Sequence, residues 1–189
     1  MYVNGDGADV YEDRVFAIAK SESKTFMPVL ILLGVRLGID RITPAYWDAL
    51  KDSLELPQSI GIAGGRPSSS HYFFAHQEDQ IFYLDPHSTR PALPFHPNSA
   101  DYTEEEVDSC HTRRLRRLNI TDMDPSMLLA FLIKDEDDWS SWRQSLERSS
   151  SKPVVHIADS EPPFHGSGDE RQSAVDEVET IDEEEDAVG

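Results

Sequence analysis

The sequence predicts an α/β fold of the α+β kind, in which a mostly antiparallel sheet is flanked by helices. Three observations predict it. Residues 26–33 form a continuous apolar run, typical of a strand buried on both faces. Residues 71–76 and 80–85 are strand-like and are separated by a short polar turn, as in a hairpin. Segments on either side of these strands carry apolar residues at helical spacing.

Charge divides the chain into a body and a tail. The 189 residues carry a net charge of −19. Residues 1–148 hold 15 basic and 24 acidic side chains, whereas residues 149–189 hold 2 and 12. We therefore predict a connector at residues 1–24, a folded part at 25–148 and a disordered acidic tail at 149–189.

The composition also excludes some classes of partner and compartment. A chain this negative repels phosphate backbones, so nucleic acid and anionic membranes are not expected as direct partners. Cys110 is the single cysteine, which excludes an intrachain disulfide framework and fits a reducing compartment. The first residues have no signal-peptide pattern, and the apolar stretch 27–35 is too short to span a bilayer. We expect a soluble intracellular protein.

The first 24 residues allow two interpretations. They begin with polar and glycine residues, and residues 11–20 are compatible with a short helix whose apolar side is Val15, Ile18 and Ala19. The alternative, which we favour, is a frayed connector.

A helix is expected after residue 43. Thr43 can cap it, and Pro44 suits its first position, where a missing N–H costs nothing. Its apolar residues recur at helical spacing: Tyr46, Trp47, Leu50 and Leu54. Residues 59–63 then predict a short strand, broken by Gly64 and Gly65.

The second half contains a loop and two more helical segments. Residues 88–102 hold three prolines and should be loop. Asp124, Pro125 and Ser126 repeat the cap-and-proline signal before an apolar segment at 127–133, which we predict to be a helix. Residues 137–148 predict a final amphipathic helix that carries Trp139, Trp142 and Leu146.

The most informative constellation is the run from Tyr83 to His87. Asp85 and His87 are two residues apart, so on an extended chain their side chains point to the same side. Pro86 favours that extended conformation in the residue before it. A carboxylate beside an imidazole fixes its tautomer and stabilises its protonated form, as a general base requires. The alternative is that Asp85 only caps a turn and His87 is exposed.

Two other features have ordinary explanations. The segment 64–71 contains paired glycines and could be a mobile loop over a site, or a solvated connection between strands. Cys110 and His111 are adjacent and make a poor catalytic dyad. Zinc binding by Cys110 with His71, His87, His96 or His111 lacks the usual ligand spacing, so a structural or surface thiol is favoured.

Together these segments resemble the autophagy-related cysteine endopeptidases of papain-like fold, in a fungal form. The resemblance covers about residues 26–142. It is carried by a glycine pair and Arg66-Pro67 before His71-Tyr72-Phe73, and by Leu84-Asp85-Pro86-His87 at this spacing. Further matching segments are 28–33, 36–38, 56–63, 106–111 and 123–127.

The resemblance implies a hydrolase, a thiol protease of autophagy and protein transport. Such enzymes cut a ubiquitin-like autophagy modifier after its C-terminal glycine and later release it from phosphatidylethanolamine. By position, His87 is the general base, Asp85 orients it, and the substrate-gating loop is Arg66, Pro67, Ser68 and Ser69. No cofactor or metal is implied. The expected partner is the modifier, as free precursor and as lipid conjugate, with membrane contact only through the lipidated substrate.

The resemblance also implies that the fold is incomplete. The family's nucleophilic cysteine lies in an upstream segment that this sequence does not contain, so we expect no peptidase activity from this chain alone. The alternative function is a non-catalytic modifier-binding fragment, for which Trp47-Asp48-Ala49-Leu50 has the pattern of a modifier-binding motif. A third possibility is that the chain is only marginally stable alone. The expected location is the cytoplasm, with the nucleus and the pre-autophagosomal structure as further sites.

Overall fold

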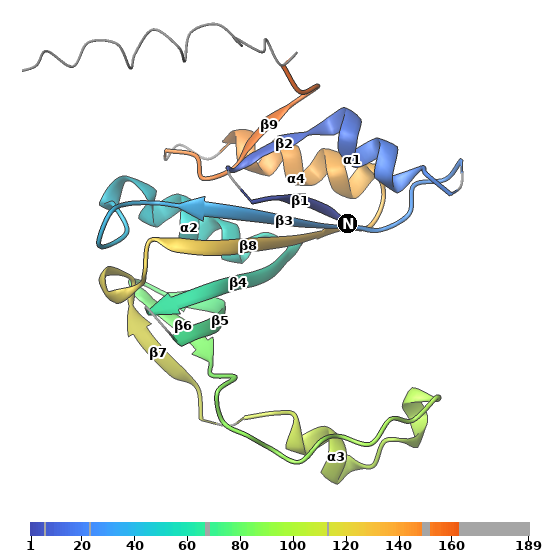
Figure 1. Ribbon diagram of the computed structural model, residues 1–189, viewed down its shortest axis with the longest axis vertical. Helices are drawn as coiled ribbons and strands as arrows, with labels where there is room; N and C mark the ends of the chain where they lie inside the picture. Colours follow the sequence, from blue (N-terminus) through green and yellow to red (C-terminus); the bar gives the residue numbers. More distant parts are fainter. Residues whose placement is uncertain (6, 23, 67–68, 113, 149–151, 163–189) are drawn as a thin grey trace, which may run out of the picture.

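The computed structural model describes residues 1–5, 7–22, 24–66, 69–112, 114–148 and 152–162, with backbone only at residues 65 and 66. A seven-stranded mixed sheet runs in the order β1-β3-β8-β4-β5-β6-β7, and β2 pairs with β9 (Figure 1). The strands are β1 Tyr2–Asn4, β2 Asp9–Tyr11, β3 Val29–Arg36, β4 Ser59–Arg66, β5 Ser69–Gln77, β6 Gln80–Leu84, β7 Arg116–Asn119, β8 Ser126–Ile133 and β9 His156–Ala158. The helices are α1 Glu12–Ala19, α2 Trp47–Glu55, α3 Glu104–Ser109 and α4 Glu136–Arg148, with 3-10 turns at Pro44–Tyr46, Ser99–Asp101 and Ile120–Asp122.

The centre of the sheet is β8, which pairs antiparallel with both β3 and β4. Residues 127–133 were predicted to be helical, and that prediction is wrong. A short apolar run fits either a buried helix or a buried strand, and here two flanking strands supply hydrogen bonds to both edges of the segment. The cap-and-proline pattern at Asp124 forms a turn before β8 and not a helix start. In this turn the Asp124 side chain accepts a hydrogen bond from the Ser126 N–H at 2.8 Å.

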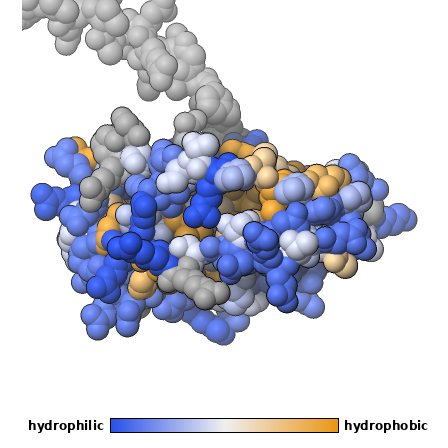
Figure 2. All heavy atoms as spheres, turned by 90° about the horizontal axis from the view of Figure 1, so that it is seen from below, coloured by the Kyte–Doolittle hydropathy of each residue, from blue (hydrophilic) through white to orange (hydrophobic). Residues whose placement is uncertain are grey.

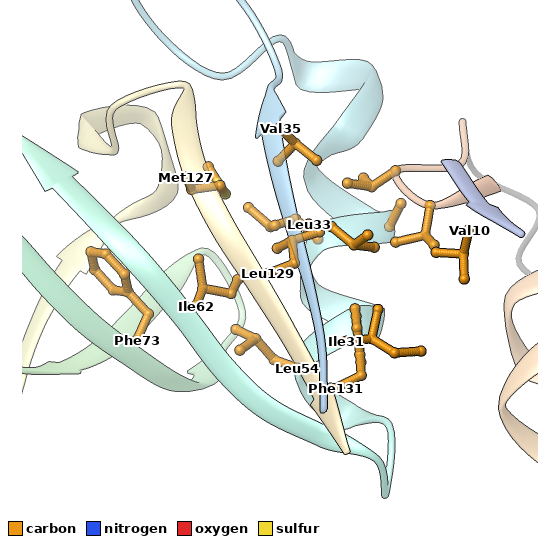
Figure 3. Packing of buried hydrophobic residues seen from close by; sticks show 14 of the residues in the cluster. Val10, Ile31, Leu33, Val35, Leu54, Ile62, Phe73, Met127, Leu129 and Phe131 are labelled. Atoms are coloured by element: carbon orange, nitrogen blue, oxygen red, sulfur yellow. The ribbon is translucent and has the colours of Figure 1, made fainter. Parts of the chain in front are cut away.

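Only one face of the central strands is fully buried. In β3 and β8, buried and half-buried residues alternate, so the expectation that residues 26–33 are buried on both faces is corrected. The buried set belongs to one hydrophobic cluster with buried residues of α1, α2 and α4, and this cluster is the core. Figure 3 shows part of it. The half-buried set is apolar too: Leu30, Leu32, Leu128, Ala130 and Leu132.

The described part of residues 1–24 belongs to the fold and is not a connector. Tyr2 lies in β1, which pairs parallel with β3, and its side chain is buried. Val10 in β2 and Val15 in α1 are both 0% exposed. The apolar spacing within residues 11–20 therefore indicated a real helix, and the core that it completes is what stabilises it.

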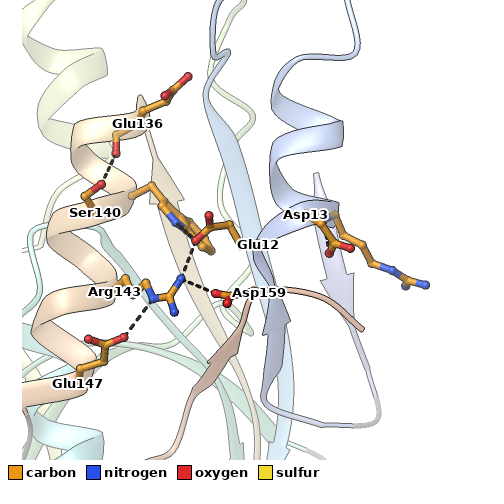
Figure 4. Close-up of polar contacts among 9 residues, drawn as sticks. Glu12, Asp13, Glu136, Ser140, Arg143, Glu147 and Asp159 are labelled. Carbon is orange, nitrogen blue, oxygen red and sulfur yellow. Dashed lines mark hydrogen bonds and ion pairs between the residues drawn. The ribbon is translucent and has the colours of Figure 1, made fainter. Parts of the chain in front are cut away.

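The described part of the predicted tail is also ordered. Val154 and Val155 are buried, and β9 pairs parallel with β2. Arg143 of α4 connects this segment to two helices. Its guanidinium donates hydrogen bonds to Glu12 of α1 at 2.7 Å, to Asp159 after β9 at 3.0 Å and to Glu147 of its own helix at 3.0 Å (Figure 4). These contacts raise the pKa of the guanidinium, first through Glu147 and then through Asp159. The rest of the predicted tail, residues 163–189, lies outside the described residues.

The predicted helices around the sheet are confirmed with small changes at their ends. α2 is preceded by the Pro44–Tyr46 turn, and Thr43 precedes that turn without a side-chain cap hydrogen bond. In α4, Trp142 is fully buried and packs against Phe131 of β8, with ring centroids 5.2 Å apart. Tryptophan spacing on α4 thus indicated its core face correctly. No helix in the described part of the chain is both long and apolar enough to cross a membrane.

The predicted hairpin is confirmed as β5 and β6, and β4 runs through Gly64 and Gly65 instead of breaking there. Gly61 sits at a bulge in β4 with φ +118°. A Cβ there would lie 2.6 Å from the Phe73 carbonyl oxygen, so glycine is required at this position.

After β6 the chain leaves the sheet and forms an arm, described at residues 85–112 and 114–115, that projects beyond β7 and carries α3 (Figure 1). The predicted loop at 88–102 is confirmed apart from one short turn. Phe95 is 84% exposed on this arm, and Leu93, Val107 and Leu115 are exposed as well. The molecule seen from this end is mostly hydrophilic, with hydrophobic residues showing between the polar ones (Figure 2).

The first 24 residues offer a direct test of the fold. Val10→Ala should lower the free energy of unfolding by about 2 kcal/mol, because it removes two buried methyl groups and leaves a cavity. Val3→Ala is the matched control, since Val3 is 56% exposed, and should change it by less than about 0.5 kcal/mol. Urea unfolding followed by tryptophan fluorescence measures both. Equal stabilities for the two variants would show that this segment is outside the cooperative core.

Candidate functional site

The candidate site lies where β6 runs into the arm. His87 Nδ1 and Asp85 Oδ1 are 2.8 Å apart, and the His87 backbone N–H donates to the same oxygen at 3.0 Å. The predicted side-by-side arrangement of these two residues is therefore present. Because the ring hydrogen bond reaches an ionised carboxylate, Nδ1 carries the proton and Nε2 is left as the acceptor.

Asp85 is held from its other side by an arginine. Arg116 of β7 forms an ion pair with Asp85 Oδ2. The pKa of Asp85 is lowered to about 2, first by the His87 backbone N–H, then by the His87 ring, and also by the charge of Arg116. The carboxylate is thus ionised throughout the neutral range and accepts hydrogen bonds on both oxygens. The His87 side chain is 49% exposed, which leaves its ring accessible.

A second histidine joins this pair, and the sequence analysis did not assign it to the site. The ring centroid of His71, on β5, lies 5.7 Å from that of His87 and 4.5 Å from that of Tyr83. Ligand atoms of His71, Asp85 and His87 all lie within 4.8 Å of one another.

The register of the hairpin explains this placement. Phe73 pairs with Tyr83 and Tyr72 with Leu84, so one further step sets His71 opposite Asp85. A bulge between Phe73 and Ala75 shifts the pairing by one residue. Without it, the neighbouring strand would present Tyr72 to Asp85. The sequence predicted the hairpin that brings β5 beside β6. It did not predict the bulge, and therefore it did not place His71 beside Asp85.

The other predicted residues are only partly described. Arg66 and Ser69 pair at the end of the β4–β5 hairpin, while Pro67 and Ser68 lie outside the described residues, as does the Arg66 side chain. The gating role of this loop stays a prediction.

Cys110 is exposed at the end of α3, consistent with the predicted surface thiol. Its neighbour His111 has Nδ1 2.7 Å from the Val107 carbonyl oxygen, so the two do not form a dyad.

Comparison with known proteins identifies the family of the chain. A family profile described as "Peptidase C54 catalytic domain" matches residues 1–145. The chain belongs to the peptidase C54 family. It is 62% identical to a "Probable cysteine protease atg4" of Sclerotinia sclerotiorum, over 98% of this chain and 42% of that protein.

Other fungal relatives agree. Identity is 53% to the "Probable cysteine protease ATG4" of Cryphonectria parasitica, over 96% of this chain and 41% of that protein. It is 54% to the "Cysteine protease ATG4" of Pyricularia oryzae, over 97% and 38%. The chain thus spans about two fifths of the length of these curated relatives. Its mixed sheet flanked by helices is consistent with the papain-like fold expected of peptidase C54, and the matched range includes the N-terminal segment that packs into the core.

Protonation of Asp85 at low pH should lower the free energy of unfolding. Its folded pKa lies below the ordinary value of 3.8, so it contributes stability that is fully present above about pH 4 and is lost as pH falls towards about 2. Asp85→Asn should therefore lose less stability than the parent protein between pH 4 and 2, measured by urea unfolding. Asp40→Asn, at an exposed position after β3, is the control and should follow the parent. A parent curve that coincides with that of Asp85→Asn would contradict the lowered pKa.

Proposed function

We propose that this chain supplies the base half of a cysteine-type endopeptidase of autophagy. The observation that carries the proposal is the Asp85–His87 pair in a chain of the peptidase C54 family, with His87 Nδ1 2.8 Å from the carboxylate and its ring half exposed. The substrate would be a ubiquitin-like autophagy modifier, cut after its C-terminal glycine or released from phosphatidylethanolamine.

The arrangement of donors and acceptors suits this chemistry. With Nδ1–H directed to Asp85, Nε2 of His87 takes the proton from a cysteine thiol, and the thiolate attacks the carbonyl carbon of the glycine. His87 then returns the proton to the leaving amine as the thioester forms. Water hydrolyses the thioester with His87 again acting as base. The ionised Asp85 stabilises the imidazolium in each step.

The thiol in this proposal comes from polypeptide other than residues 1–189. Cys110 is exposed on the arm, and within the described ranges no hydrogen bond joins it to His87 or Asp85. The apolar face that carries Leu30, Leu32 and Leu128 is only half-buried. It therefore offers a surface on which the remaining three fifths or so of the relatives' chain length would pack. Alone, the chain would be inactive and less stable than the assembled enzyme.

The remaining parts of the proposal concern access and location. Arg66 and Ser69 pair at the end of the β4–β5 hairpin, and together with Pro67 and Ser68 they would supply the gate that admits the modifier's tail. Contact with the membrane would come only through the lipidated substrate. We propose the cytoplasm, the nucleus and the pre-autophagosomal structure as its locations.

The alternative of a non-catalytic modifier-binding fragment has less support. Its candidate motif, Trp47 to Leu50, lies in α2, where Leu50 is 0% exposed and Trp47 packs against the core. A partner could not reach the aliphatic position of the motif without unfolding the helix.

Complementation tests the proposed function. The chain alone should not cleave a modifier–reporter fusion. Cleavage should appear when the unmatched part of the Sclerotinia relative is co-expressed and the two polypeptides associate. His87→Ala should then lower the cleavage rate by about 10²–10⁴-fold, because the general base is lost.

His111→Ala is the matched control, since His111 is exposed on the arm, and it should leave the rate unchanged. Cleavage by the chain alone that thiol alkylation abolishes would refute the proposal that the nucleophile lies elsewhere. Co-purification without cleavage would refute the proposed activity.

A further inference from the structure

We propose that His71, Asp85 and His87 form a binding site for a divalent transition metal, with Zn²⁺ as the best fit, and that an ion bound there withdraws His87 from catalysis. The binding itself depends only on the three side chains. Its inhibitory consequence rests on the proposed peptidase function.

The donor set is the first argument. Two imidazoles and one carboxylate are a common three-ligand set for Zn²⁺, with a fourth position left for water or another group. Within the described ranges, these residues are the one group of three or more metal-binding side chains close enough to share an ion. His76 with Glu55 and His96 with Glu106 bring only two ligands each.

The distances between the ligand atoms are close to those around a tetrahedral zinc ion. Ligand atoms of the three residues lie within 4.8 Å of one another, and His87 Nδ1 and Asp85 Oδ1 are 2.8 Å apart. Four donors about 2.0 Å from a tetrahedral zinc ion are about 3.3 Å from each other. Side-chain rotations that move these atoms by about an ångström would therefore bring the three ligands to one ion.

Neighbouring side chains limit how far two of the ligands can move. His71 lies edge-on to Tyr83, at 4.5 Å between ring centroids, and to Phe73, at 6.2 Å. Arg116 pairs with Asp85 Oδ2, so Oδ1 is the oxygen that faces the imidazoles. Such outer contacts orient metal ligands and reduce the entropy that is lost on binding. His87 is the more exposed ligand and can adjust.

The proton balance gives the inhibitory effect. An ion held by Nδ1 of His87 and Oδ1 of Asp85 takes the place of the proton that these atoms now share. A neutral imidazole bound through Nδ1 carries its one proton on Nε2, so the proton moves to Nε2 through water and Nε2 is no longer an acceptor. The ion then occupies the position of the hydrogen bond that orients the base. An imidazole that donates its lone pair to a metal cannot stabilise itself as an imidazolium, so thiol deprotonation stops.

The test uses the full chain with Co²⁺ and Zn²⁺ as probes, in a Cys110→Ser background that removes the thiol as a competing ligand. Visible absorption of Co²⁺ reports its coordination geometry, and titration calorimetry with Zn²⁺ gives affinity and stoichiometry. We expect one ion per chain. His71→Gln, Asp85→Asn and His87→Gln should each weaken binding by about tenfold or more. His111→Gln, a histidine on the arm outside the cluster, should bind as the parent does.

Three results would overturn the proposal: no binding by the parent, binding by His71→Gln equal to that of the parent, or weakened binding by His111→Gln. His87→Gln guards against a folding artefact, because His87 is 49% exposed and its replacement leaves the core intact. Since binding is read from spectra and heats, a failure of the metal site and a failure of the peptidase proposal remain distinguishable.

Discussion

The structure depends on the pairing of β8 with both β3 and β4. Eight successive residue pairs join β3 to β8, from Val29 with Ile133 to Arg36 with Ser126. These strands are about a hundred residues apart in sequence, so the hydrogen bonds close a long loop and the burial of Ile31, Leu33 and Phe131 must offset its entropy. Without β8 the sheet would separate into two parts. The part that carries the candidate site would lose the neighbour of β4, on which β5, β6 and β7 are built in turn.

An element of the fold could be predicted from the sequence when the residues that determine it lie within a few positions of one another. The β5–β6 hairpin, α4 and the Asp85–His87 pair each follow from spacing within a few residues, and the structure contains all three. Residues 127–133 have no such signal, since an apolar run of that length becomes a strand only when distant strands pair with it. Residues 1–24 were assigned to a connector because the partners of their few apolar residues are distant in sequence. Val10 pairs with Ile157 of β9, and Phe16 packs against Trp139 of α4.

His71 at the site could not be predicted for a related reason. Alternation along an extended strand fixes which residues share a face, but it does not reveal where a bulge reverses that order. The bulge between Phe73 and Ala75 puts His71 and Phe73 on the face of Tyr83 and Asp85. A site that forms at the end of a strand is therefore sensitive to one irregularity several residues away. The same irregularity orders the aromatic rings that support His71.

Arg116 affects how strongly the Asp85 carboxylate attracts the His87 ring and any cation beside it. By pairing with Oδ2, it helps to keep the carboxylate ionised, so the shared proton stays on the His87 ring. The same positive charge offsets part of the attraction that the carboxylate exerts on an imidazolium or on a bound cation. A site with Asp85 and no arginine would stabilise the protonated base more strongly and would also bind cations more strongly. Arg116 thus lowers the attraction for an imidazolium and for a cation, while the short contact between Asp85 and His87 maintains the ring orientation that the proposed proton transfer needs.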